Sequence, residues 1–168
     1  RFSYSASWKF NNNLKFPLVV KPATHGSSIG LSIIDKKEGL DQAIDLAFSF
    51  DDIVLIEGAG GLIVPLTRTY TVLTLIQDLS VPVLVVARAG LGTINHTSLT
   101  VNTLKSFEVP IIGVILNYFK GGIIEEDNKK IIGTLNNVNI LGVVPFSKNL
   151  KELAGKFEKY IDMEKFLW

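Results

Sequence analysis

The residues best suited to chemistry are an acid and a glycine-rich turn at positions 57–61, Glu-Gly-Ala-Gly-Gly. They follow a short apolar run, residues 53–56, whose pattern predicts a strand. Glycines let backbone N–H groups approach an anion, and a carboxylate at a strand end can bind a Mg²⁺ that bridges phosphate oxygens. Glu57 is therefore a candidate metal and phosphate residue. A tight turn capped by an acid explains the same residues equally well.

A second cluster, residues 87–96, leads from the end of a predicted strand into the start of a predicted helix. Free N–H groups at a helix start bind carboxylates or phosphates. Thr93 or Asn95 is available to cap the helix instead, and plain capping accounts for the cluster as well. His96 can act as a base, but a single His after a helix cap more often caps or packs. The same holds for His25, which stands among small residues.

The third candidate is Asn117, which follows the apolar run at residues 111–116. A side-chain amide offers both a donor and an acceptor, as does the edge of a purine ring. One Asn after a strand is weak support for a nucleotide site, so this reading needs other residues beside it.

The elements that must position these residues repeat one theme: an apolar strand, a Gly-rich or polar turn, and a helix. Near-continuous apolar strands that alternate with helices predict an α/β fold, with a parallel sheet covered by helices on both faces. Ligands of such sheets bind beyond the carboxyl ends of the strands, where all three candidate turns lie. The predicted strands are residues 53–56, 83–87, 111–116 and 140–144, and the predicted helices are 71–79, 94–107 and 124–135.

The first 50 residues are organised differently. Residues 1–16 show neither helical nor strand periodicity and are expected to be irregular. Residues 17–34 predict a strand, a small-residue loop and a second strand, and apolar residues at helical spacing predict a helix over about 40–48. The sequence opens at Arg1 rather than Met, so we expect a fragment or a processed product.

Composition limits the possible functions. The 168 residues, 47% of them hydrophobic, suit one compact domain. A formal charge of +1 provides no field for nucleic acid or an anionic membrane. The apolar runs are far shorter than the roughly 20 residues of a membrane helix. The absence of cysteine excludes disulfides and thiolate ligands and is compatible with a cytoplasmic location.

Four segments together resemble dethiobiotin synthetase: residues 54–66, 82–96, 113–117 and 142–146, in the order and spacing of that family. The resemblance covers about residues 52–168. It implies a P-loop-NTPase-like fold and an ATP- and Mg²⁺-dependent carbon–nitrogen ligase of biotin biosynthesis. That family closes a cyclic urea on 7,8-diaminopelargonic acid with CO2, through phosphorylation of a carbamate and displacement of phosphate by the neighbouring amine.

The resemblance also implies roles for individual residues. Glu57 corresponds to a Mg²⁺ and nucleotide-phosphate residue, and Asn117 to the reader of adenine. The other residues implied at the nucleotide are Gly58, Ala59, Gly60, Tyr118, Val144, Pro145 and Phe146. The residues implied to hold the tail carboxylate of the substrate, across the interface of a homodimer, are Gly92, Thr93, Ile94 and Asn95.

The sequence departs from that family because no Gly-x-x-x-x-Gly-Lys-[Ser/Thr] run is present. Residues 16–32, followed by 53–57, instead resemble the ATP-grasp core of D-alanine–D-alanine ligase. That resemblance implies that Lys21 contacts nucleotide phosphates, with residues 26–30 folded over them, so Lys21 is the substitute for the lost lysine. We therefore expect a single α/β domain that is a chimera, with a divergent segment at 1–51 and a synthetase-like part at 52–168.

Three functions follow as expectations. The first is the ATP-dependent ligase, with a diamino acid and ATP as small-molecule partners. The second is a non-catalytic nucleotide-binding or structural domain, which the missing P-loop favours and the retained Glu57 and Asn117 disfavour. The third is a fragment of D-alanine–D-alanine ligase, against which the motifs after residue 57 argue. A divergent synthetase with a replaced front end and a coincidental short match are the alternatives to a chimera.

Overall fold

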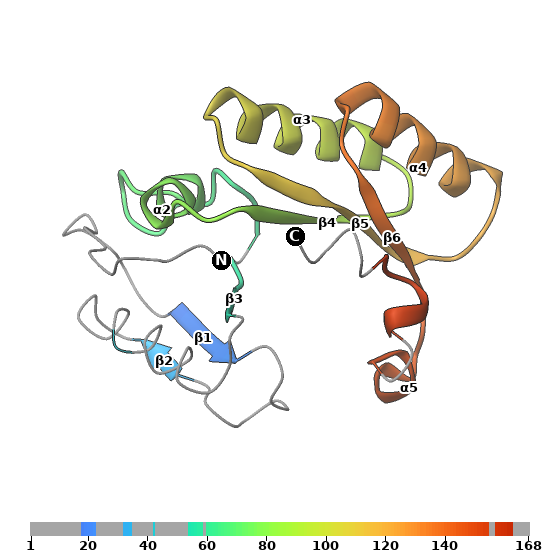
Figure 1. Cartoon of the computed structure of the whole chain (residues 1–168), viewed down its shortest axis with the longest axis horizontal. Coiled ribbons are helices and arrows are strands. Elements are labelled where there is room, and N and C mark those ends of the chain that lie inside the picture. The colour runs from blue at the N-terminus through green and yellow to red at the C-terminus, as the bar shows by residue number, and fades with distance from the viewer. Residues whose placement is uncertain are drawn as a thin grey trace. The chain divides into compact units, whose positions relative to one another are not determined.

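The computed structural model describes residues 18–22, 32–34, 42, 54–58, 60–154 and 157–162. The chain divides into two compact units, Arg1–Leu79 and Ser80–Trp168, and each is described by itself (Figure 1). The predicted irregular segment at 1–16, the loop at 24–30 and nearly all of the predicted helix at 40–48 lie outside the described residues.

The second unit is built on a parallel sheet of three strands in the order β4-β5-β6. Parallel neighbours require a crossover, and a helix supplies each one. This confirms the predicted α/β class and the predicted strands and helices of residues 83–144, with small shifts at their ends. The elements are β4 (Val83–Arg88), α3 (Thr93–Ser106), β5 (Ile111–Phe119), α4 (Ile123–Asn136) and β6 (Ile140–Pro145).

The middle strand β5 carries the core of this unit. Successive side chains of a strand point to opposite faces, and both faces of β5 are covered: Val114, Ile115 and Leu116 are all buried. Figure 1 shows α3 and α4 together on one side of the sheet. Ile115 belongs to a separate cluster with Leu141, Val144 and Ile161. Burial on both faces explains why β5 reads as a continuous apolar run rather than an alternating one.

The chain after β6 returns to that strand. It forms α5 (Leu150–Ala154) and the 3-10 turn η1 (Phe157–Lys159), and Ile161 then bridges to Gly142 in antiparallel fashion. Val143 N–H donates to the carbonyl of Tyr160 (3.1 Å), and Asp162 N–H donates to that of Leu141 (2.7 Å). A Cβ on Gly142 would lie 2.1 Å from the carbonyl oxygen of Tyr160. The close approach of the two backbones therefore requires glycine there.

The first unit contains a separate antiparallel sheet in the order β2-β1-β3. Its strands are β1 (Leu18–Pro22), β2 (Ser32–Ile34) and β3 (Val54–Ile56). The prediction that residues 53–56 open the parallel sheet is wrong, because β3 pairs with β1 in antiparallel register. An apolar run three residues long carries no information about the direction of its partner, since hydrophobic pattern specifies a face and not a neighbour.

The last element of the first unit is α2 (Val72–Leu79), which confirms the helix predicted over 71–79. Thr71 caps it: Thr74 N–H donates to Thr71 Oγ1 (3.2 Å). Tyr70, 1% exposed, donates its hydroxyl to Asp78 Oδ2 (2.5 Å) and thereby fixes the preceding loop to the helix. Burial, followed by that hydrogen bond and the charge of Asp78, raises the pKa of Tyr70. Among the described residues no helix is long and apolar enough to cross a membrane.

Candidate functional site

The carboxyl ends of β4, β5 and β6 bring three of the predicted segments together. Arg88 is opposite Asn117, and Ala89 N–H donates to the carbonyl of Asn117 (2.8 Å). On the other side of β5, Phe146 N–H donates to the carbonyl of Phe119 (2.8 Å). The start of α3, the end of β5 and the end of β6 thus share one edge of the sheet, as expected for neighbouring parallel strands.

The start of α3 has no side-chain cap. Thr93 is buried and its hydroxyl pairs with that of Thr97 (3.2 Å), and Asn95 is exposed without capping the helix. Neither of the two residues available to cap α3, Thr93 or Asn95, therefore does so. The first N–H groups of a helix lack intrahelical partners, so those of Ile94 and Asn95 are available to an anion. This favours the anion-site reading over plain capping.

The turn before α3 depends on glycine. Gly92 has φ of 88°, in the left-handed region that side chains disfavour. A Cβ there would also lie 3.4 Å from His96 Cε1. His96 is exposed, and its ring lies beside Gly92.

Asn117 and two aromatic residues form the part of the site suited to a planar base. Asn117 Oδ1 accepts from the N–H of Tyr118 (2.8 Å), so the amide NH2 is the part of this side chain that can donate to a ligand. The rings of Tyr118 and Phe146 are 5.4 Å apart and tilted by 44°, and both are substantially exposed. Lys120 Nζ lies 5.8 Å from the Phe146 ring. Exposed aromatic faces can stack on a planar base. The Asn117 amide beside them can donate to one acceptor on the edge of that base.

Two residues of this edge were missed by sequence reasoning. Glu125 Oε2 accepts from the N–H groups of Lys120 (2.7 Å) and Gly121 (2.9 Å), and Asn128 Nδ2 donates to the carbonyl of Ala89 (3.0 Å). The signal that could have identified them is their spacing. The two polar residues stand three apart, on the face of α4 that also carries buried Ile132. Such residues interrupt an otherwise apolar face and need partners.

The other predicted residues lie in the first unit. Glu57 is exposed directly after β3, and Lys21 in β1 pairs with Leu55, two residues before it. Gly60 has φ of 85°, and a Cβ there would lie 2.7 Å from Val64 Cγ2, so this turn also requires glycine. Ala59 lies outside the described residues.

Among the described residues of the first unit, Glu57 is the candidate metal ligand. No group of three His, Cys, Asp or Glu side chains that could hold a metal occurs within the described part of the chain. One exposed carboxylate, Glu57, fits Mg²⁺, which is commonly held by one or two carboxylates together with phosphate oxygens and water.

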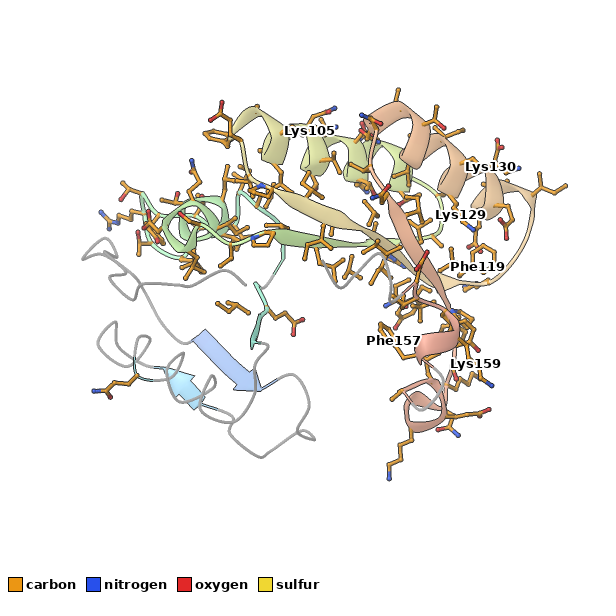
Figure 2. All side chains as sticks on the ribbon, viewed as in Figure 1. Lys105, Phe119, Lys129, Lys130, Phe157 and Lys159 are labelled. Carbon is orange, nitrogen blue, oxygen red and sulfur yellow. The ribbon has the colours of Figure 1, made fainter. Side chains whose placement is uncertain are left out.

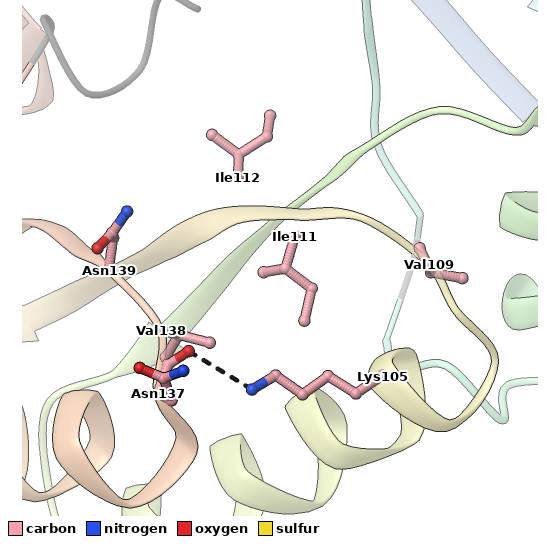
Figure 3. Close-up of a pocket in the computed structure, with 7 residues that line it drawn as sticks. All are labelled: Lys105, Val109, Ile111, Ile112, Asn137, Val138 and Asn139. Carbon is pink, nitrogen blue, oxygen red and sulfur yellow. Dashed lines mark hydrogen bonds between the residues drawn. The ribbon is translucent and has the colours of Figure 1, made fainter.

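A shallow pocket of about 280 Å³ lies at the opposite edge of the sheet, at the amino ends of β5 and β6 (Figure 3). None of the predicted site residues lines it. Lys105 of α3 donates from Nζ to the carbonyl of Asn136, and more weakly to that of Asn137 (3.4 Å), at the end of α4. A cation on the last carbonyls of a helix stabilises that helix end, so Lys105 is a structural clamp. The lining residues are Lys105, Val109, Ile111, Ile112, Asn137, Val138 and Asn139.

Several known proteins are similar in sequence to this chain. A family model described as an AAA domain matches residues 8–154. The ATP-dependent dethiobiotin synthetase BioD of Bacillus velezensis is 39% identical over 120 residues, which is 67% of this chain and 50% of that protein. The BioD proteins of Nitrosopumilus maritimus (33% over 119 residues, 69% and 52%) and Bacillus cereus (38% over 129 residues, 76% and 50%) are also similar.

These matches bear on the organisation of the chain. The chain spans about half the length of the curated relatives it matches. The family match continues through residues 16–32 and across the expected junction near residue 52. The comparisons thus support the resemblance to dethiobiotin synthetase and give no support to a segment of D-alanine–D-alanine ligase type or to a chimera.

Proposed function

The chain belongs to the AAA domain family, and from that premise we propose that it is an ATP- and Mg²⁺-dependent ligase of the dethiobiotin synthetase type. The observation that carries the proposal is the meeting of an uncapped helix start, an amide and two exposed aromatic rings at the carboxyl edge of β4-β5-β6. Each of these suits a different part of a nucleotide or a carboxylate substrate. The 33–39% identity to ATP-dependent dethiobiotin synthetases supports the same reading.

We assign the nucleotide base to the second unit. Asn117 donates to an acceptor on the base, and Tyr118 and Phe146 offer it aromatic faces. Val144 and Pro145 precede Phe146 at the end of β6, where backbone groups reach the base and ribose. In the first unit we assign Glu57 to Mg²⁺ and phosphate, with Gly58, Ala59 and Gly60 in the same turn and Lys21 in the neighbouring strand. Mg²⁺ would neutralise charge on the phosphate oxygens when bound.

We assign the substrate carboxylate to the start of α3. The N–H groups of Ile94 and Asn95 would receive it, and Gly92 and Thr93 set the direction of the helix. The proposed substrate is 7,8-diaminopelargonic acid, whose carboxylate lies at the far end of the chain from its two amines. Binding at the tail therefore orients the amines for ring closure without contact at the reacting nitrogens.

The missing Gly-x-x-x-x-Gly-Lys-[Ser/Thr] run limits how tightly this chain holds ATP. Each lost charge-assisted phosphate contact forfeits roughly 1.5–3 kcal/mol, so several together weaken binding by orders of magnitude. We therefore expect micromolar or weaker affinity for Mg-ATP. The same observation favours a second candidate function, a nucleotide-binding domain that does not complete the reaction by itself.

Calorimetric titration of the whole chain with Mg-ATP tests the proposal. Asn117→Ala should weaken binding, whereas Asn139→Ala, an exposed Asn at the opposite edge of the sheet, should leave it unchanged. Equal affinities for the two variants would remove the base site from Asn117. Phosphate release that depends on both 7,8-diaminopelargonic acid and bicarbonate would support the ligase. Binding without such release would favour the non-catalytic alternative.

A further inference from the structure

Two side chains near the start of α4 hold the backbones of both loops at the carboxyl edge. The Glu125 carboxylate accepts from Lys120 and Gly121 in the loop after β5. The Asn128 amide donates to Ala89 in the loop after β4. Residues three apart in a helix lie on the same side of it, so one side of α4 reaches both loops.

These contacts join α4 to the two loops, although Glu125, in the first turn, also stabilises the start of the helix. The helix begins after Gly122 without a side-chain cap, and the groups that Glu125 and Asn128 bind all lie outside the helix. Asn128 is 7% exposed and Ala89 is fully buried, so a broken bond between them would leave buried polar groups unpaired. Glu125 also faces the turn before α3, because a Cβ on Gly90 would lie 3.9 Å from Glu125 Oε1.

We propose that Glu125 and Asn128 are positioning residues, which hold the start of α3 and the end of β5 in fixed relation so that an anionic group and a nucleotide base bind side by side. This inference rests on the proposed function, which supplies the two ligands. Asn128 acts on the Gly90–Gly92 turn through the carbonyl of Ala89. Glu125 acts on the segment that follows Asn117 and Tyr118 by binding the two N–H groups beyond Phe119. Neither residue touches a ligand.

The same helix offers a matched control for each residue. Asn136 lies two turns beyond Asn128, is 3% exposed, and donates to Ser98 Oγ and to the carbonyl of Ile132, far from either loop. Replacing either Asn removes a buried amide, but only Asn128 contacts the β4–α3 loop. Glu126 is the neighbour of Glu125 and is exposed.

The first measurement is amide hydrogen exchange on the whole chain. Asn128→Leu should speed exchange at Ala89 and Thr93, whose N–H groups are hydrogen-bonded in this loop, by about tenfold relative to the parent, whereas Asn136→Leu should not. Glu125→Ala should do the same at Lys120 and Gly121, and Glu126→Ala should not. Asn128→Ser, which is too short to reach Ala89, replaces Asn128→Leu if the latter fails to fold. Equal effects of the Asn128 and Asn136 variants on exchange at Ala89 and Thr93 would overturn the proposal.

The second measurement is calorimetric titration with 7,8-diaminopelargonic acid and with Mg-ATP. Asn128→Leu should weaken binding of the diamino acid by about tenfold and change Mg-ATP affinity little. Glu125→Ala should weaken Mg-ATP binding by about tenfold and change the affinity for the diamino acid little. A general loss of stability would weaken both ligands alike, and that result would count against positioning. If the parent binds neither ligand, the proposed function fails, and the exchange comparison alone still decides whether these residues hold the loops.

Discussion

Glu57 is exposed at the end of β3. Neutralising its charge distinguishes a role as a metal ligand from a role in stabilising the turn. We expect Glu57→Gln to lower Mg-dependent affinity for ATP because the charge that binds the metal is lost. The melting temperature should stay unchanged, since an exposed carboxylate has little desolvation cost to relieve. If the side chain instead caps its own glycine turn, stability falls and ATP affinity is unaltered. Thermal unfolding and titration of this variant beside the parent decide between the two.

Tyr70 links stability to pH through its buried hydroxyl. Its pKa in the folded chain is raised by burial and by Asp78, so the folded state keeps the proton above pH 10, where an unfolded tyrosine ionises. Stability should therefore be fully present below about pH 10 and fall as pH rises beyond it. Tyr70→Phe should cost roughly 1–3 kcal/mol at pH 8, because Asp78 loses its partner, and should flatten the alkaline decline. Urea unfolding at pH 8 and pH 10.5 measures both; an equal decline in parent and variant would contradict the assignment.

Among single residues, the sequence identified those whose conformation depends on their immediate neighbours in the chain. Gly60 and Gly92 stand in turns after predicted strands, and both have positive φ. Asn117 was found for the same reason, from its place after an apolar run. Asn128 was missed because its partner Ala89 is 39 residues away in the chain. A bond of that kind is created by the packing of α4 against the loop and leaves no local spacing to detect.

At the scale of elements, Lys105 joins two helices by a charge on a helix end. Lys105→Met keeps the apolar stem and removes the ammonium from the carbonyls of Asn136 and Asn137. The loss should be roughly 0.3–1 kcal/mol, the usual worth of a cation at a helix C-terminus. Lys130→Met on the exposed side of α4 is the control and should cost less. Urea unfolding of the two variants compares them, and identical midpoints would show that the clamp contributes nothing.

The elements themselves were predicted well wherever a strand is long and buried on both faces. β5 spans nine residues, and its helices are long enough to show their own periodicity. β3 spans three, and its antiparallel pairing with β1 could not be foreseen from its composition. The direction of a short strand depends on where the segments on either side are held, which is a property of the tertiary structure.

At the scale of the whole molecule, we expect a homodimer. Large apolar side chains are exposed on the outer surface of α3 and α4, and such surfaces commonly mark protein interfaces. The formal charge of +1 gives little repulsion between copies. The most exposed of these residues on α3, α4 and the turn before α3 are Leu91, Leu99, Ile123, Ile124 and Leu135. If the surface is an interface, the start of α3 is at its border.

Sedimentation of the parent, Leu99→Glu and Phe157→Glu tests the dimer. Leu99→Glu should give a monomer, because a charge buried at an interface is costly. Phe157 is also exposed but lies on η1, so its variant should remain dimeric (Figure 2). A monomeric parent at micromolar concentration would contradict the prediction.

The predicted single domain with a boundary near residue 52 stays a prediction. The first compact unit of the structure ends at Leu79.

The bridge between Gly142 and Ile161 has a consequence for solubility. A strand at the border of a sheet presents unpaired N–H and C=O groups that can recruit strands from other molecules and begin aggregation. Residues 160–162 occupy those groups on Leu141 and Val143. The bridge therefore protects the exposed edge of β6, and any bulkier residue at position 142 would displace residues 160–162 from that edge. Loss of this bridge would appear first as aggregation of the folded protein, before the protein unfolds.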